Sequence, residues 1–304
     1  MAFSAFATWT AKEQAPRRKS KIALLLLLPG TLYLALFFLV PLVSLVMTSL
    51  QEPVPFGDVG EFQTAFKWQN YVAVVDTYGE HILRSFGYAM AATVLALLFS
   101  YPLAYFIGVK ARQWPLLQNL MLVLVIAPFF ISFLLRTIAW KSILSDESFV
   151  ITGLKALSLM APDAHFTGTP AAVIFGLTYN FIPFMTLPIY ATLERLDVRL
   201  LEAGSDLYSK PVTSFFKVTV PLSMTGIVSG VLLTFIPASG DYINASSTFL
   251  GGQNTVMIGN VVESNFIGPS PNYPEAAALS IILMLVILVL VTVYVKRSGT
   301  EDLL

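Results

Sequence analysis

The chain has 304 residues, of which 56% are hydrophobic and 12% are charged, whereas a soluble domain carries about 25% charged residues. We therefore expect a membrane protein. The absence of cysteine excludes disulfides, zinc-thiolate sites and thiol nucleophiles. The two histidines, His81 and His165, are too few for a histidine-rich metal site, so we assign no metal ligand and no catalytic residue. The zero net charge gives no indication of a nucleic-acid partner.

Six segments are long and apolar enough to cross a bilayer core of roughly 30 Å. In chain order they are residues 22–50, 84–108, 116–139, 169–193, 222–248 and 276–295. Basic residues precede the first segment, but it is too long for a signal peptide and no small-x-small cleavage site follows it, so we expect a retained helix. The predicted fold class is an all-α membrane protein. One transmembrane domain, residues 22–295, lies between an N-terminal segment, residues 1–21, and a tail, residues 296–304.

The basic residues predict the orientation, because lysine and arginine accumulate on the cytoplasmic side of a membrane. Starting the chain inside leaves few of them outside, namely Lys67, Arg84, Arg136, Lys141 and Lys155. We therefore expect both ends and the loop 194–221 in the cytoplasm. The outer loops, residues 51–83, 141–168 and 249–275, carry most of the acids. These acids indicate a solvated anionic face or, alternatively, attraction of a cationic solute or docking of an extracellular partner.

The loop 194–221 has the pattern of two short helices. An apolar stripe with spacings of four, three and four predicts an amphipathic first helix, and it consists of Leu196, Leu200, Ala203 and Leu207. Ser209 is a plausible N-cap and Pro211 a first-turn residue of the second helix. One interpretation is a connector lying in the lipid interface. The other is a docking element with one face towards the membrane domain, and the mixed charges of the first helix favour a protein groove.

Part of this loop resembles the EAA loop of ABC-importer permeases of the type I, MetI-like fold. Glu202 and Ala203 match the beginning of that motif, and Pro221 matches its terminal proline. Asp206 and Leu207 belong to the same block, "LLEAGSDL". The resemblance implies that this loop couples the permease to a cytoplasmic ATPase.

Three positions depart from the motif. Gly204 replaces the second alanine, Tyr208 stands where the family has a turn glycine, and residues 218–220 replace I-x-L. Glycine adopts the left-handed helix stop more readily than tyrosine. We therefore expect the turn to be built differently, with Pro211 as the break.

Further blocks resemble the spermidine/putrescine permease family over nearly the whole chain. They include "SYPLAYFI" from Ser100, "SFLLRTIAW" from Ser132, "IPASGDYI" from Ile236 and "GGQNTVMIGNVVESNF" from Gly251. The resemblance implies a bacterial plasma-membrane complex with a homologous second permease subunit, two ATPase subunits and an external solute-binding protein. ATP and Mg²⁺ would bind to the ATPase subunits, and this chain has no P-loop motif and no cofactor of its own.

Asp241 is the main candidate for the translocation path, since an acid near the bilayer interior requires a partner or a purpose. It follows Pro237 and Gly240 after a long apolar run. It could meet an ammonium group of the solute, or it could be a helix-end cap or an ion-pair partner of Arg136. The neighbouring candidates are Tyr242, Asn244 and Glu263.

The preferred function is a permease subunit of an ATP-driven importer for a small organic cation, with a polyamine as the expected solute. Alternatives are an ABC permease for another small solute and an ATP-independent secondary transporter or channel. The sequence shows no internal repeat, which is a common feature of secondary transporters. An intramembrane enzyme would need a nucleophile and a base in the spans, and neither is evident, so we expect a transport subunit and not an enzyme.

Overall fold

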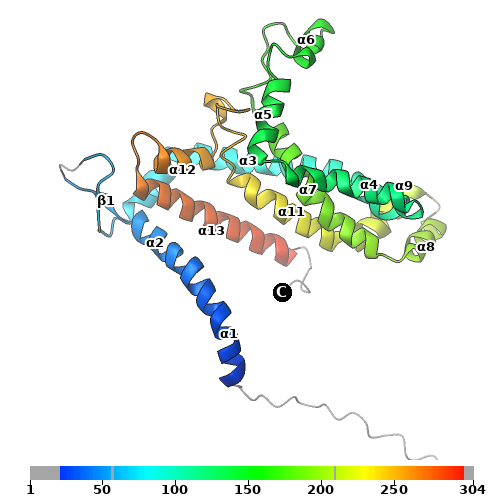
Figure 1. Cartoon of the computed structure of the whole chain (residues 1–304), viewed down its shortest axis with the longest axis horizontal. Helices are drawn as coiled ribbons and strands as arrows, with labels where there is room; N and C mark the ends of the chain where they lie inside the picture. The colour runs from blue at the N-terminus through cyan, green and yellow to red at the C-terminus, as the bar shows by residue number, and fades with distance from the viewer. Residues whose placement is uncertain (1–20, 56–57, 209, 298–304) are drawn as a thin grey trace, which may run out of the picture. The chain divides into compact units, whose positions relative to one another are not determined.

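The computed structural model describes residues 21–55, 58–208 and 210–297 (Figure 1). The predicted N-terminal segment and tail therefore lie almost entirely outside the described part, and Ser209 does so as well. Contacts divide the chain into two units, residues 1–47 and residues 48–304.

The first unit contains a continuous helical stretch. α1 (Lys21–Leu34) leads through a π-helical turn, η1 (Ala35–Leu39), into α2 (Val40–Ser49). From Leu26 the helix is almost entirely apolar, and none of its residues from Leu26 to Met47 is buried. Such a helix suits a lipid environment, and Leu26–Ser49 has the length expected of the first predicted span.

The second unit begins with a small hairpin in which β1 (Glu52–Pro53) pairs antiparallel with β2 (Phe62–Gln63). α3 (Gln69–Tyr105) follows at once. The predicted loop 51–83 is therefore wrong in its second half, because the helix already begins at Gln69. The first turns of α3 have a helical apolar stripe that packs against the C-terminal helices, and it consists of Tyr71, Val74, Tyr78 and Ile82. The acids Asp76 and Glu80 between these residues conceal the stripe in a hydropathy scan.

Two of the predicted spans are broken helices. α4 (Pro115–Ile126) and η4 (Ala127–Phe130) meet α5 (Phe133–Ile143) at 98°. The segment of α9 (Pro211–Ser214), η5 (Phe215–Thr219) and α10 (Val220–Leu222) meets α11 (Met224–Ser239) at 69°. α11 is also shorter than the predicted span 222–248, because the chain after Ser239 folds into turns. Of the described helices four can span a membrane, or six if each bent pair forms one span.

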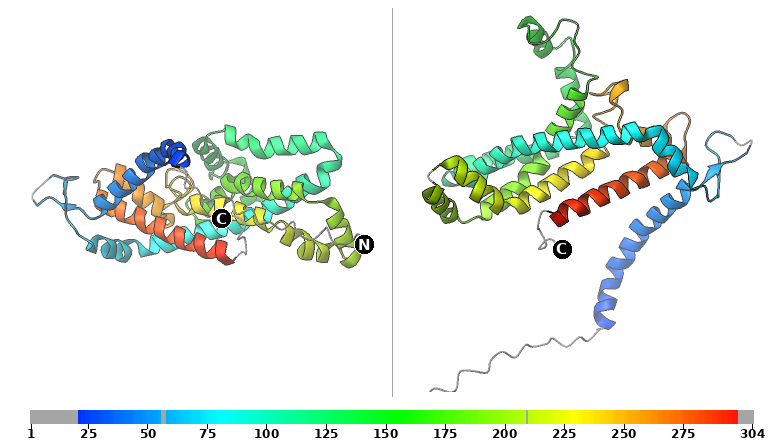
Figure 2. Two further views of the ribbon diagram at one scale, coloured as in Figure 1. Left: turned by 90° about the horizontal axis from the view of Figure 1, so that it is seen from below. Right: turned by 180° about the vertical axis from the view of Figure 1, so that it is seen from behind.

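The remaining helices complete the second unit. η2 (Phe106–Lys110) and η3 (Ala111–Gln113) end the α3 stretch, and α6 (Phe149–Ala156) follows α5. α7 (Pro170–Arg195) leads into α8 (Val198–Tyr208), while η6 (Gln253–Thr255) and α12 (Ile258–Ile267) precede α13 (Tyr273–Arg297). Within this unit α8 and α12 lie at opposite ends of the helices, and α6 projects away from them (Figures 1 and 2).

The core of the second unit consists of α3, α7 and α11, which pack against one another. Glycines let α11 approach α7 closely. A Cβ on Gly226 would lie 2.6 Å from Thr192 Oγ1 and 2.8 Å from the Pro188 carbonyl oxygen, and one on Gly230 would lie 2.8 Å from Met185 Sδ. Glycines four residues apart are a common means of close helix packing in membranes, where no hydrophobic force drives helices together.

We expect Gly226→Ala to destabilise the fold by about 1–3 kcal/mol, because the added methyl group meets the backbone of α7. Thermal unfolding of the detergent-purified protein measures this loss. Gly87→Ala is the matched control, since nothing lies within 4 Å of a Cβ at Gly87. Equal unfolding midpoints for the two variants would contradict the proposed packing of α11 on α7.

Candidate functional site

The predicted coupling loop begins where α7 ends, and Arg112 holds this end. Arg112 Nη1 donates to the carbonyl of Leu196 at 3.2 Å, and Nη2 donates to the carbonyls of Leu193, at 3.0 Å, and Glu194. The last carbonyls of a helix lack donors within the helix and attract a cation. Arg112 therefore ties η3 to the start of the loop. No sequence motif marks this role.

The first helix of the loop is present as α8. Its side that carries Gly204 packs against the second helical segment of the loop. A Cβ on Gly204 would lie 2.9 Å from Val218 Cγ2 and 3.0 Å from Ser214 Oγ. An alanine at this position would need the Val218 and Ser214 side chains to move. Because Gly204 has no side chain, α8 packs closely on α9 and η5 at this position.

The predicted apolar stripe of α8 is largely exposed. Leu207 is 80% exposed and Leu200 is 51% exposed, whereas Leu196 is half-buried against the core. Ala203 and Asp206 are exposed as well. The side chains of Glu202 and Tyr208 lie outside the described part. α8 ends at Tyr208 and α9 begins at Pro211, so the helices are separate and the second one starts at the expected proline.

The second segment of the loop packs on α3 through Phe215. Its ring lies edge-on to Tyr101 at 5.3 Å and to Tyr105 at 5.7 Å. Val212 and Phe216 point outward, with exposures of 67% and 64%. We use the term loop face for the exposed apolar side chains of this loop, which are Leu200, Ala203 and Leu207 of α8 together with Val212 and Phe216. Phe216 also lines a groove with Leu97 and Leu98 of α3.

Asp241, the main path candidate, lies just after α11 and is buried. Its Oδ2 accepts hydrogen bonds from the backbone N–H of Asn244 at 2.7 Å and of Ala245 at 3.4 Å, and its Oδ1 accepts from Asn244 Nδ2 at 3.1 Å. These are the contacts of a cap on the turn that follows α11. Burial raises the pKa of Asp241 to about 6, although these hydrogen bonds act in the opposite direction.

Asn244 connects this turn to two helices. Its Oδ1 accepts from Asn180 Nδ2 at 3.2 Å and from Thr137 Oγ1 at 3.5 Å. A Cβ on Gly176 would lie 2.6 Å from the same oxygen, so α7 leaves room for the amide. Asp241, Asn244, Asn180 and Thr137 form a buried polar cluster between α5, α7 and the turn after α11. An amide inside an apolar helix, as at Asn180, was the available sequence signal for this cluster.

The other path candidates lie outside the polar cluster. Arg136 is buried beside it in α5, with its Cζ 5.5 Å from the Phe133 ring centroid. Among the described residues, no ion pair joins Arg136 to Asp241. Tyr242 is half-exposed, and its carbonyl accepts from Asn260 Nδ2. Glu263 is exposed on α12. The structure thus brings together two of the five predicted path residues, Asp241 and Asn244.

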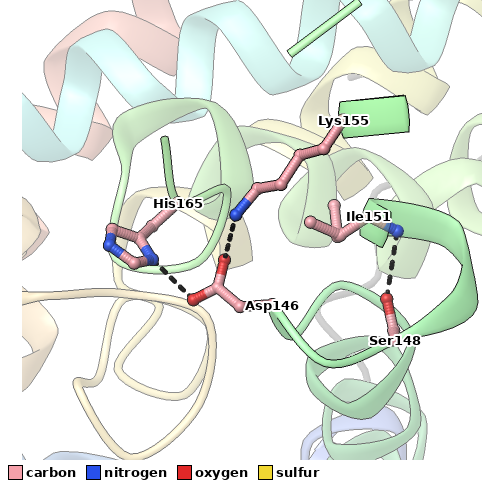
Figure 3. A network of polar contacts seen from close by, with 5 residues as sticks. All are labelled: Asp146, Ser148, Ile151, Lys155 and His165. Atoms are coloured by element: carbon pink, nitrogen blue, oxygen red, sulfur yellow. Dashed lines mark hydrogen bonds and ion pairs between the residues drawn. The ribbon is translucent and has the colours of Figure 1, made fainter. Parts of the chain in front are cut away.

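Polar contacts of Asp146 join separate parts of the predicted outer loop 141–168 (Figure 3). The two carboxylate oxygens of Asp146 contact His165 Nδ1 and, at 3.5 Å, Lys155 Nζ. The hydrogen bond from His165 is the main cause that lowers the pKa of Asp146. Ser148 Oγ accepts from the backbone N–H of Ile151 at 3.2 Å and caps α6. His165 therefore contacts the opposite end of its own loop.

Comparisons of the sequence relate the chain to transport components. Residues 100–298 match the family model described as binding-protein-dependent transport system inner membrane component. The spermidine/putrescine transport system permease protein PotB of Escherichia coli is 33% identical over 267 residues, which are 88% of this chain and 94% of that protein. PotB of Haemophilus influenzae is 35% identical over 231 residues, covering 76% of this chain and 79% of the relative.

Solved structures show the same fold. A bacterial ABC transporter involved in the import of the acidic polysaccharide alginate matches with a TM-score of 0.63 at 16% identity, over 92% of this chain and 96% of that one. The MetNI methionine ABC transporter matches with a TM-score of 0.57 at 16% identity, over 74% and 96%. The expected all-α ABC-importer permease fold is thereby confirmed.

The raised pKa of Asp241 makes the free energy of unfolding depend on pH. A carboxyl group whose pKa is raised on folding binds its proton more tightly in the folded state, so stability falls as pH rises from about 4 to about 6 and is level above. The pKa shift lowers the free energy of unfolding by about 3 kcal/mol over this pH range. We expect Asp241→Asn to remove this fall in unfolding midpoints measured from pH 4 to pH 7.

Asp163→Asn is the control, because Asp163 is exposed. It should retain the pH dependence of the unmodified protein. An unchanged dependence in the Asp241→Asn variant would show that the carboxyl group is not buried as described.

Proposed function

Because the chain belongs to the family of binding-protein-dependent transport system inner membrane components, we propose that it forms half of the translocation path for a polyamine in an ATP-binding-cassette importer. The relatives that match most of the chain are named spermidine/putrescine permeases, and their names supply the solute class. The family comprises transport components, in agreement with a transport subunit rather than an enzyme.

The loop face carries the coupling part of the proposal. Large apolar side chains that are 64–80% exposed, such as Leu207, Val212 and Phe216, are unfavourable in water and typical of a surface that binds a partner. The loop behind them is held by Arg112, Gly204 and Phe215. A partner that moves the loop face would therefore move the helices behind it. The proposed partner is the ATPase dimer, which holds ATP and Mg²⁺.

The other partners follow from the architecture of such importers. A homologous second permease subunit supplies the other half of the path, and an external solute-binding protein delivers the solute. A structural relative, the alginate importer, is known in complex with a periplasmic protein. The orientation proposed from the basic residues places α8 and both chain ends on the cytoplasmic side of a bacterial plasma membrane, and α12 near the outer side.

The path residues are proposed to have two roles. Asp241 and Asn244, as parts of the polar cluster, shape the end of α11, with Arg136 beside them. Tyr242 and Glu263 are exposed at the same end of the unit and are available to the solute. A carboxylate such as Glu263 suits the ammonium groups of a polyamine.

We expect Leu207→Asp to weaken binding of the ATPase subunits, because a charge replaces an exposed apolar side chain of the loop face. The loss should be about tenfold or more in affinity. Co-purification of the ATPase subunits and ATP-dependent uptake of labelled spermidine into proteoliposomes both measure it. Leu207 is 80% exposed, so the fold should tolerate the change.

Val59→Asp is the control, since Val59 is 76% exposed between β1 and β2, away from the loop face. It should keep the ATPase subunits bound. Spermidine flux that is indifferent to ATP would favour a secondary transporter, and ATP hydrolysis stimulated by another solute alone would favour a different substrate.

A further inference from the structure

The bend between α10 and α11 centres on one buried side chain, Ser223. The helical segment before it meets α11 at 69°. Ser223 is fully buried, and its Oγ lies 2.9 Å from the Thr219 carbonyl and 3.1 Å from the Val220 carbonyl. A carbonyl only accepts, so the single hydroxyl hydrogen of Ser223 is directed to these carbonyls.

Tyr101 of α3 completes the hydrogen bonding at this bend. Its hydroxyl lies 2.7 Å from Ser223 Oγ, in a buried position. Since the hydrogen of Ser223 is already used, the Tyr101 hydroxyl donates and Ser223 Oγ accepts. The Tyr101 ring also packs edge-on against Phe215, at 5.3 Å. One side chain of the core therefore contacts the loop both before the bend and at it.

The bond favours one arrangement of the bend. Tyr101 is 7% exposed, so neither hydroxyl has ready access to water. A change of the bend that separated them would leave the buried Tyr101 hydroxyl without its acceptor, and an unpaired buried donor costs more than the bond itself contributes. α3, the second helical segment and α11 are therefore held together at this point, at the α8 end of the unit (Figure 1).

We propose that Tyr101 is a positioning residue for coupling. Its hydrogen bond to Ser223 makes the α8–α10 loop move as one body with α3 and α11. Without the bond, the angle between the second helical segment and α11 changes when the loop is displaced. ATP hydrolysis then continues, but less solute is transported for each ATP. This inference rests on the proposed function, and it adds a residue outside the loop motif.

The test uses the complete complex in proteoliposomes, with labelled spermidine and binding protein outside and ATP inside. Tyr101→Phe removes only the hydroxyl. We expect the uptake per ATP hydrolysed to fall about fivefold, the effect of losing one neutral hydrogen bond from the coupled arrangement. Complex yield and ATP hydrolysis should stay at the unmodified level. A merely structural role would lower these two quantities as well.

The chain offers a matched control and a second variant. Tyr105 packs on the same Phe215 ring at 5.7 Å, and its hydroxyl bonds to no residue that the structure describes, so Tyr105→Phe should leave the ratio unchanged. Ser223→Ala removes the acceptor and should lower the uptake per ATP hydrolysed, as Tyr101→Phe does. The double variant should be no worse than either single one, because both remove the same contact.

The outcomes separate the inference from the proposed function. An unmodified complex that takes up spermidine with ATP, with the same ratio in Tyr101→Phe, overturns the inference alone. Parallel losses of complex yield, ATP hydrolysis and uptake in both Tyr101→Phe and Ser223→Ala also overturn it. An unmodified complex without ATP-dependent uptake overturns the proposed function and the inference with it.

Discussion

α11 lies directly against α7 because Gly226 and Gly230 carry no side chain at the contact, and both candidate sites depend on this approach. The helix runs from Ser223 at the coupling loop to the turn that Asp241 caps. Its 16 residues span about 24 Å. Since backbone atoms of α7 lie close to the glycines, α11 has little freedom to move relative to α7. Any displacement at one end is therefore transmitted to the other.

The two ends of α11 are held in different ways. At the loop end, apolar and aromatic packing dominates, with Tyr101 of α3 supplying a hydrogen bond to Ser223. At the other end, a buried polar cluster joins the turn to α5 and α7 through Asn244. Buried polar groups specify one arrangement because alternatives leave them unpaired. The cluster thus fixes the turn that carries Tyr242, and the Tyr242 carbonyl accepts from Asn260 of α12, the helix that carries Glu263.

The sequence allowed the class, the helical fold and the two short helices of the loop 194–221 to be predicted, because apolar length and helical periodicity are local signals. The early start of α3 was missed, since Asp76 and Glu80 interrupt its apolar stripe. The end of α11 was missed although the residues after Ser239 are mostly small or polar. Their turns form through close contacts with Gly176 and Gly259, which is a tertiary effect. The contacts of Arg112 and Tyr101 were not predicted, because their partners are about 80 or more residues away in the chain.

The central claim is that the coupling loop and α11 form one rigid body. The chain has no cysteine, so spin labels on Lys210→Cys and Leu233→Cys report one distance, from the loop to an exposed site of α11. The measurement is this distance distribution by pulsed electron spin resonance in the complete complex, without nucleotide and with ATP bound. The account predicts the same narrow distribution in both states. A shifted or broadened distribution with ATP would contradict it.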